Sequence, residues 1–337
     1  MIKKLIKILS IIFLVLIPII LYLSFIGIKT ERFNKRINNK ILEINKNINL
    51  DLKSIVFLLN PYDFTVKITT KDPKILIEGK QILIKNIKTK ISLKSLIIDE
   101  FSINDAEIRT EKIKLDDLIL LGKSFRNSAQ LFLLDRSIKD GFLTASIKLK
   151  FDNEGKIKND YQIDGFVENG KLDILNKFNV ENLNFDFKVS ENKYTLKKTT
   201  FKFNNAKLLF PTIEANKKNN LIFVNGEVQT NEKDFNDNQL NLLFEDSLKD
   251  LNIKKINFNS INKFSFNINK KLKFNNLNIS SKVNLSQLVV DSNSLGIKSF
   301  LPNYNGKTIF ENHKIIINFS KNKLEIKGRG KALIAGK

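Results

Sequence analysis

The chain has 337 residues, a formal net charge of +22, one histidine and no cysteine. This composition excludes disulfides, thiolate metal sites and metal sites that need several histidines. The positive charge is nearly all lysine, whereas arginine is preferred for bidentate contacts with phosphates and bases. Lysine, asparagine, isoleucine and phenylalanine are over-used together, which indicates nucleotide bias. We therefore predict no nucleic-acid partner, no cofactor and no metal.

The first predicted element is an apolar run over 5–28, which carries no charge from Ile8 onward. A helix needs about 20 apolar residues to cross a bilayer, and Pro18 in mid-run is tolerated better in a membrane helix than in a soluble one. A cleaved secretory signal is the alternative, but 22–28 offer no small-residue cleavage site. We predict an uncleaved single-pass transmembrane anchor within 1–28. Basic residues flank both ends, so the positive-inside rule does not decide its orientation.

The next segment, 29–48, is predicted to hold a short amphipathic helix. Phe33, Ile37, Ile41, Ile44 and Ile48 recur at steps of three and four, which places them on one helical face. Two roles fit this pattern: the helix lies on the membrane surface, or it caps the end of the following domain.

From residue 49 onward the apolar period changes to two, which predicts strands with one apolar and one polar face. The clearest alternation involves Ile147, Leu149, Phe151, Leu183, Phe185, Phe187, Val189, Phe264, Phe266, Ile268, Ile315, Ile317 and Phe319. Further strands are expected over 50–57, 64–70, 75–77, 82–93, 98–109, 156–167, 195–203, 221–230, 254–259, 272–280, 283–290 and 324–326.

Three segments interrupt the strands. The segment 115–136 predicts one or two helices, 231–251 predicts another, and 294–301 a shorter one. The predicted fold class is therefore mainly β: a transmembrane helix followed by a long antiparallel sheet with a few short helices. Alternation alone is compatible with a sandwich, a closed sheet or an open, curled sheet whose apolar face forms a groove.

No pattern in the sequence indicates catalysis. Phosphate-loop, dinucleotide-binding and zinc patterns are absent from it. Asp116 and Asp117 have no partner base, so we expect them at a helix N-terminus. His313 is expected in a turn, as a solvated surface residue. We predict that the protein is not an enzyme and has no catalytic residues.

An exposed apolar groove needs a partner, because soluble surfaces rarely leave large apolar patches uncovered. Next to a membrane, that partner is an acyl chain, which costs about 0.8 kcal/mol per CH₂ to expose to water. A groove lined by the thirteen alternating residues named above would remove most of this cost. They are our candidates for lipid contact.

A family resemblance supports this interpretation. After the anchor and the short helix, the chain continues with INLDLKSIVFLLNPYDFTVKIT at 48–69, ISLKSLIIDE at 91–100 and EFSINDAEIRTEKI at 100–113. This order resembles the N-terminal part of AsmA-like proteins, which are relatives of TamB and of the eukaryotic bridge-like lipid transfer proteins. The segment 138–174 resembles their repeat units.

The resemblance implies an AsmA-like β-groove domain over 49–337 in the periplasm of a Gram-negative envelope, anchored in the inner membrane by 5–28 with the N-terminus inside. It implies that the groove conducts phospholipid acyl chains toward the outer membrane, in lipid transport and outer-membrane biogenesis. Full bridges of this family are longer, so we expect a truncated member or one that works with envelope protein partners. The alternative is a periplasmic scaffold or envelope assembly factor with a closed β core and no lipid conduit.

Overall fold

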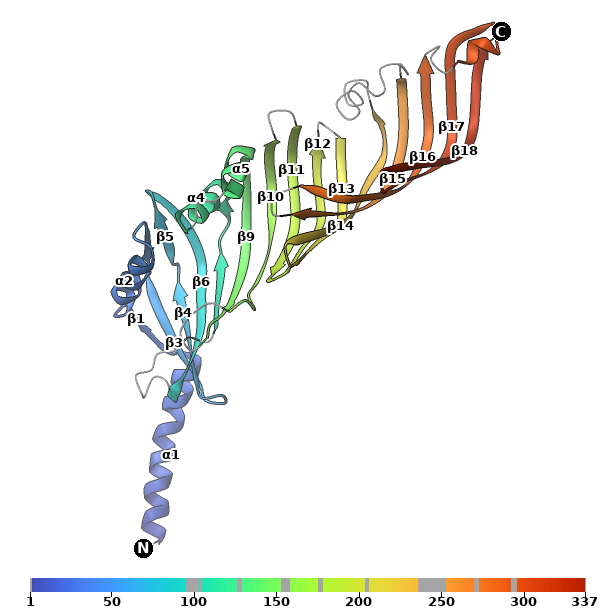
Figure 1. Ribbon diagram of the computed structural model, residues 1–337. Coiled ribbons are helices and arrows are strands. Elements are labelled where there is room, and N and C mark those ends of the chain that lie inside the picture. The colour runs from blue at the N-terminus through green and yellow to red at the C-terminus, as the bar shows by residue number, and fades with distance from the viewer. Residues whose placement is uncertain are drawn as a thin grey trace. The chain divides into compact units, whose positions relative to one another are not determined.

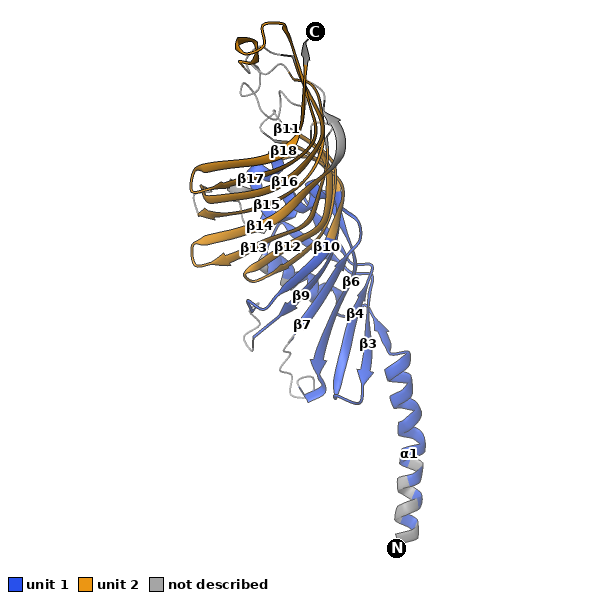
Figure 2. Ribbon diagram, turned by 90° about the vertical axis from the view of Figure 1, so that its right-hand side faces the viewer, with its two compact units in different colours: residues 1–136, 142–165 blue, residues 137–141, 166–337 orange. Residues whose placement is uncertain are grey.

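The computed structural model describes residues 2–94, 103, 105–125, 129–152, 158–174, 178–203, 206–235, 253–269, 273–291 and 296–336. These residues are mainly β, and their strands form one large antiparallel sheet that does not close over the described part of the chain (Figure 1). The predicted fold class is confirmed to this extent, and the open sheet is the architecture present. The chain divides into two compact units (Figure 2): unit 1 comprises 1–136 and 142–165, and unit 2 comprises 137–141 and 166–337.

Helix α1 (Ile2–Phe25) opens unit 1, and its end is fixed against the sheet. The backbone N–H groups of Ile26 and Gly27 both donate to the carbonyl oxygen of Tyr22, at 2.9 Å. Gly27 has a φ of +73°, and a Cβ atom there would lie 2.3 Å from the Phe57 carbonyl oxygen, so only glycine fits. Strand β1 (Ile28–Thr30) follows and pairs with β3. Strand β1 therefore separates α1 from the amphipathic segment, because the backbone of β3 recruits 28–30 into the sheet.

The described side chains of α1 are largely exposed; Leu14 is 75% and Phe25 81% exposed. Within the part of the chain that the structure describes, no helix combines the length and the hydropathy needed for a membrane span. The anchor over 5–28 stays a prediction.

The remaining strands of unit 1 are β2 (Ile48–Asp51), β3 (Ser54–Asn60), β4 (Thr65–Lys71), β5 (Lys74–Ile77), β6 (Lys80–Ser92), β7 (Asp105–Thr110), β8 (Ile113–Lys114) and β9 (Ile138–Lys150). Antiparallel pairing gives the order β1–β3–β4–β6–β7–β9. The short strand β2 pairs with β5, which pairs with β6, and β8 pairs with β9.

Helices α2 (Asn34–Ile44) and α4 (Leu115–Phe125) supply apolar side chains to the core of unit 1, and α5 (Ala129–Ser137) follows α4. Ile37 and Ile41 of α2 pack on a buried cluster that includes Ile55 and Ile91, and Leu118 of α4 packs on a second one. Because the core already uses its apolar face, α2 has the capping role rather than the membrane-surface role. The helices predicted over 115–136 are confirmed as α4 and α5.

The other strands are β10 (Gln162–Ile174), β11 (Phe178–Ser190), β12 (Lys193–Phe203), β13 (Ala206–Lys218), β14 (Leu221–Phe235), β15 (Ile253–Asn269), β16 (Phe274–Asp291), β17 (Tyr304–Ser320) and β18 (Lys323–Gly336). From β11 to β18, each strand pairs antiparallel with the next strand along the chain. The 3-10 helix η3 (Ile297–Ser299) replaces the helix predicted over 294–301, of which 294 and 295 lie outside the described residues.

Bulges interrupt the long strands of unit 2. Asn182, Lys198 and Asn312 have positive φ values of 52°, 51° and 52° and lie at shifts in the strand register. An extra residue of this kind bends a strand and raises its local twist. Strict alternation is lost at each bulge, yet apolar residues on both sides of it still face the same way.

Several predicted boundaries are corrected. Residues 254–259 and 264–268 belong to the single strand β15, and 272–280 and 283–290 to β16. Residues 231–235 extend β14 instead of starting a helix, and 236–252 lie outside the described residues.

Strand β13 was not predicted at all, and it contains Pro211. In the structure Pro211 lies where the β13–β14 register is interrupted, between Leu209 and Ile213. A proline there removes no regular ladder hydrogen bond.

Candidate functional site

The candidate site is a set of apolar side chains on one face of unit 2, called here the apolar face. Residues directly opposite each other in an antiparallel pair point to the same side of a sheet. The strand registers from β11 to β18 therefore place one row of residues on that side: Phe187, Leu196, Ile213, Gly226, Phe264, Ile279, Phe319 and Leu324.

Phenylalanine rings connect neighbouring strands on this face. The ring centroids of Phe201 and Phe210 lie 5.5 Å apart in a stacked geometry, and Phe210 meets Phe264 edge-on at 6.2 Å. Phe264 stacks on Phe266 at 6.0 Å, and Phe266 lies 5.3 Å from Phe274. These distances are typical of favourable aromatic pairs. The contacts form a continuous aromatic path from β12 to β16.

Gly226 makes this path possible where it crosses β14. A Cβ atom at Gly226 would lie 2.6 Å from Cζ of Phe264, so the ring covers the backbone of β14 at this position. Gly226 pairs with Ile213 on one side and with Phe264 on the other. A glycine weakens a strand interior, but an aromatic ring laid over it restores packing. The ring of Phe264 thereby reaches Phe210, two strands away.

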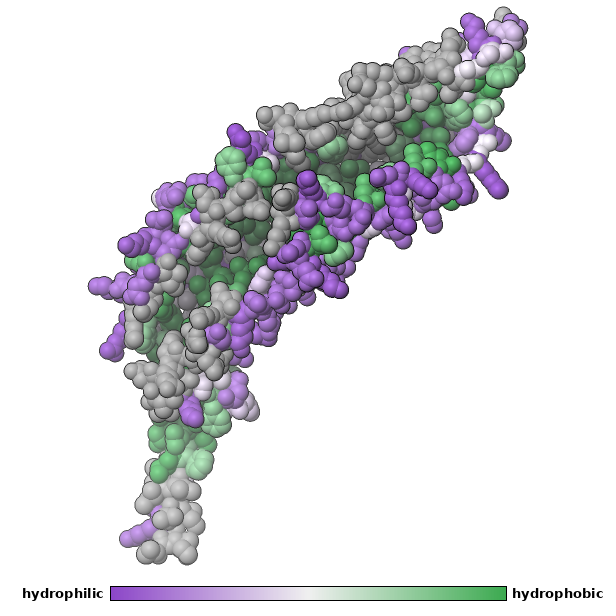
Figure 3. Space-filling view, in the orientation of Figure 1, coloured by the Kyte–Doolittle hydropathy of each residue, from purple (hydrophilic) through white to green (hydrophobic). Residues whose placement is uncertain are grey.

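The opposite face of unit 2 is mainly polar, although Phe223, Ile261 and Ile316 also lie on it and are 41–46% exposed. It carries exposed charged residues such as Asp186, Lys188 and Lys282. The pocket of about 330 Å³ lined by Asp186, Lys188, Lys197 and Glu214 among others lies on this side. Because lysines and carboxylates alternate there and form ion pairs such as Lys193–Glu214 (3.1 Å), we interpret it as a solvated surface. Figure 3 shows hydrophobic side chains gathered over unit 2, with hydrophilic ones along its margin.

The structure places ten of the thirteen candidate residues on strands of unit 2: Leu183, Phe185, Phe187 and Val189 on β11, Phe264, Phe266 and Ile268 on β15, and Ile315, Ile317 and Phe319 on β17. All are half-buried. Phe185 and Phe187 contact each other edge-on, with ring centroids 6.2 Å apart. All ten lie on strands, and their role as lipid-contact residues stays a prediction.

The three candidates near β9 belong to unit 1. Ile147 pairs with Ile108, which packs on the buried core, and Leu149 pairs with Ala106. Phe151 follows the last residue of β9.

Sequence reasoning missed several residues of the apolar face, above all Phe210 on the unpredicted strand β13. The apolar pair Leu208 and Phe210 just before Pro211 was the available signal. Leu324 and Ile326 were recognised as alternating, but they were not named as candidates; they are 62% and 61% exposed.

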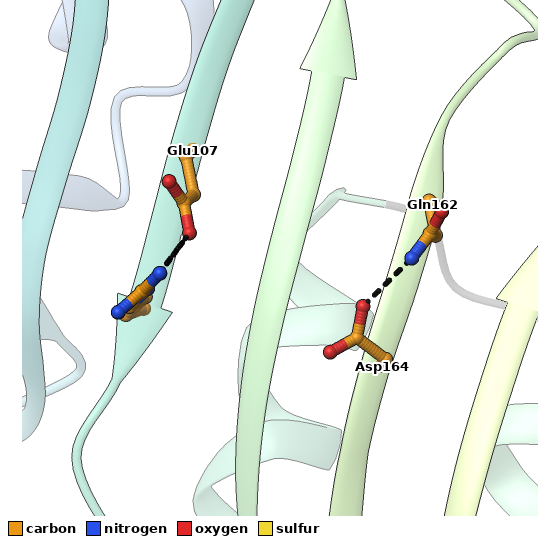
Figure 4. Close-up of polar contacts among 4 residues, drawn as sticks. Glu107, Gln162 and Asp164 are labelled. Carbon is orange, nitrogen blue, oxygen red and sulfur yellow. Dashed lines mark hydrogen bonds and ion pairs between the residues drawn. The ribbon is translucent and has the colours of Figure 1, made fainter.

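Two carboxylates of unit 1 that could support chemistry, Glu107 and Asp164, are hydrogen-bonded to neighbouring side chains. Figure 4 shows two pairs of neighbours on single strands: Arg109 donates to the Glu107 carboxylate at 2.7 Å, and Gln162 donates to Asp164 at 2.9 Å. The hydrogen bond from Arg109 lowers the pKa of Glu107, so this carboxyl is ionised at neutral pH and is a poor proton donor. Among the residues that the structure describes, no group of three His, Asp or Glu side chains could hold a metal ion.

Asp116, Asp117 and His313 lie within helices or strands, and Asp117 and His313 contact neighbouring residues of the fold. Asp116 and Asp117 lie in the first turn of α4, as predicted, and Asp117 pairs with Lys80 at 2.9 Å. The prediction for His313 is wrong: it lies within β17, half-buried, and not in a turn. Its ring contacts Phe310 edge-on at 5.6 Å and lies over Gly330, where a Cβ would be 2.1 Å from Nδ1. The bulge at Asn312 immediately precedes His313.

No family model, no curated protein and no solved structure matches the chain. The similarity to AsmA-like proteins therefore stays a prediction, and 95–102 and 104 of the segments that carry it lie outside the described residues.

Proposed function

We propose that the protein is a membrane-anchored lipid carrier of the AsmA-like type, in which the apolar face of unit 2 holds phospholipid acyl chains. One observation carries this proposal: the row from Phe187 to Leu324 continues across neighbouring strands, and large side chains of the apolar face stay open to solvent, Leu324 in the row and Phe274 on the aromatic path. Phe274 is 69% and Leu324 62% exposed. Patches of this kind on soluble proteins mark interaction sites.

The dimensions and energetics suit a lipid tail. Adjacent strands lie about 4.8 Å apart, so a row from β11 to β18 extends roughly 34 Å across the sheet. One tail occupies half of a hydrocarbon core about 30 Å thick. A tail of about 16 carbons costs roughly 13 kcal/mol to expose to water. A continuous apolar row would offset most of this cost and needs no catalytic residue.

The finer parts of the proposal concern location. Helix α1 anchors the chain in the inner membrane with its N-terminus inside, and both units lie in the periplasm, where lipid moves toward the outer membrane. The uncharged run from Ile8 to Ile28 and the exposed apolar side chains of α1 support an anchor. A scaffold with a closed β core is the weaker candidate, because the sheet of the described residues is open.

The test is native mass spectrometry of the full chain purified in mild detergent. We expect co-purified phospholipid on the wild type and its loss in Phe264→Asp, because a carboxylate would replace the central ring of the aromatic path. Lys263→Asp is the matched control: it makes the same residue one position earlier, on the polar face. A folded wild type free of lipid in every preparation would overturn the proposal, and so would a Phe264→Asp variant that retains lipid.

A further inference from the structure

Four uncharged polar residues interrupt the apolar face and form what we call the polar belt: Thr230 on β14, Ser260 and Asn262 on β15, and Ser281 on β16. Thr230 pairs with Ser260, and Asn262 pairs with Ser281. Ser260, Asn262 and Phe264 are separated by steps of two without a register shift, so all three point to the same side of β15. The belt therefore belongs to the face that carries the aromatic path.

Apolar residues lie on both sides of the belt. Phe264 and Ile279 are paired on one side, and Phe258 and Leu285 on the other. The belt contains no charged side chain. The lysines next in sequence, Lys263 and Lys282, lie on the opposite face of the sheet.

The hydrogen bonds within the belt leave one hydroxyl hydrogen over. The Asn262 side-chain amide donates to Ser260 Oγ at 2.8 Å and to the Val228 carbonyl oxygen at 3.3 Å. Ser260 Oγ and Thr230 Oγ1 lie 2.8 Å apart and share one hydrogen bond. Two hydroxyls carry two hydrogens, so one remains for an additional acceptor. The spare hydrogen belongs either to Ser260, which is 4% exposed, or to Thr230, which is half-buried.

A second buried hydroxyl on the same face points to the same conclusion. Thr199 on β12 pairs with Phe210, a member of the aromatic path, and is 4% exposed. Among the described residues, its Oγ1 atom has no hydrogen-bond partner. A hydroxyl of this kind is satisfied by ordered water or by an acceptor on a bound molecule.

We propose that the polar belt binds the ester-linked glycerol region of a diacyl lipid. The ester carbonyl oxygens accept hydrogen bonds from the belt, while the tails lie along the aromatic path at Phe264. An uncharged belt suits esters better than an anionic headgroup, which would favour lysine or arginine. This inference rests on the proposed function, because it assumes that the apolar face carries lipid.

The test compares two probes on the full chain in detergent: phosphatidylethanolamine with ester-linked tails and its diether analogue with the same headgroup and tail length. The diether lacks the carbonyl acceptors. We expect the wild type to retain the ester lipid about three- to tenfold better, the effect of one hydrogen bond. Thr230→Val keeps the shape of the side chain but removes its hydroxyl, and it should abolish the preference. Ser265→Ala, which removes a hydroxyl from the opposite face of β15, should keep it.

The outcomes separate this inference from the proposed function. Equal retention of both lipids by the wild type would overturn the proposal that the belt binds ester groups. It would leave the proposed lipid-carrier function unaffected. A preference that survives in both Thr230→Val and Ser260→Ala would overturn it too, and two variants cover the event that one does not fold. Retention of neither lipid by folded wild type would overturn both proposals.

Discussion

Unit 1 and unit 2 use the same alternating strands but treat their apolar faces differently. In unit 1, Ile55, Ile77, Ile82 and Ile91 are less than 2% exposed, and side chains of α2 and α4 pack against the clusters that they form. In unit 2, the predicted apolar residues are half-buried, and Phe274 remains 69% exposed. The comparison teaches that a period of two specifies which side of a strand is apolar, while separate elements decide whether that side is covered.

The difference predicts opposite responses to a buried charge, and the largest effect is expected in unit 1. Ile55→Asp would place a carboxylate among Leu52, Val66 and Ile68, where it cannot reach water. This costs several kcal/mol, a large part of the stability of a typical domain. We expect the cooperative thermal transition of unit 1 to be lost. Circular dichroism, measured as the temperature rises, would detect this loss. A variant that unfolds like the wild type would show that this core is not closed.

In unit 2, the same kind of change should leave the fold intact and abolish lipid binding. Phe185→Asp and Phe266→Asp put a carboxylate on the apolar face, where it can reach water when no lipid is bound. We expect cooperative unfolding close to that of the wild type but no co-purified lipid by mass spectrometry. Asp186→Asn, on the polar face, is the control and should change neither property. Unfolding of both aspartate variants would favour a closed core and the scaffold function.

A smaller effect is expected at Gly226. Gly226→Ala would push the ring of Phe264 away from β14, because the added Cβ would lie 2.6 Å from Cζ. Overpacking of this kind typically costs about 1–3 kcal/mol. We expect a lower thermal midpoint and weaker lipid retention together. Gly328→Ala is the control, since its added Cβ would meet Ile315 at an ordinary 3.5 Å. Equal shifts in both variants would contradict a special role for Gly226.

The smallest effect is expected at Glu107, which lies between Lys88 and Lys148 on neighbouring strands of unit 1. Its pKa is lowered in the folded protein, chiefly by the hydrogen bond from Arg109. The ionised form is therefore favoured on folding, so the contribution to stability is present at neutral pH and is lost as the pH falls below about 4. We expect Glu107→Gln to lower the free energy of unfolding by less than about 1 kcal/mol at pH 7. The difference from the wild type should shrink as acid protonates the carboxyl of the folded protein; a difference that does not depend on pH would contradict the assignment.

Sequence reasoning found the parts of the fold that depend on local pattern. β11, β15 and β17 alternate strictly around Phe187, Phe266 and Ile317, and α2 has its apolar residues at helical spacing. It missed β13, because a proline in a strand is tolerated only where the ladder is already irregular, and register is not visible in a single segment. His313 was expected in a turn, but β17 continues through the bulge at Asn312, so the residue lies within a strand.

Less of the candidate site could be predicted from the sequence, because its contacts join residues on different strands. Gly226 and Phe264 are far apart in sequence, and their contact depends on the pairing of β14 with β15. The belt forms in the same way, since Thr230 and Ser260 belong to separate strands. Nothing in the local pattern of either strand distinguishes these residues from ordinary polar positions.

The junction at Gly27 has a mechanical consequence. A glycine after a helix often serves as a swivel, but here the Phe57 carbonyl oxygen fills the space beside it. The next three residues are clamped to β3 through the pairs Ile28–Phe57, Lys29–Val56 and Thr30–Ile55. Because Ile55 belongs to the buried core, a pull on α1 loads the core of unit 1 directly. We therefore expect a change in the tilt of α1 to be accompanied by a change in the tilt of unit 1.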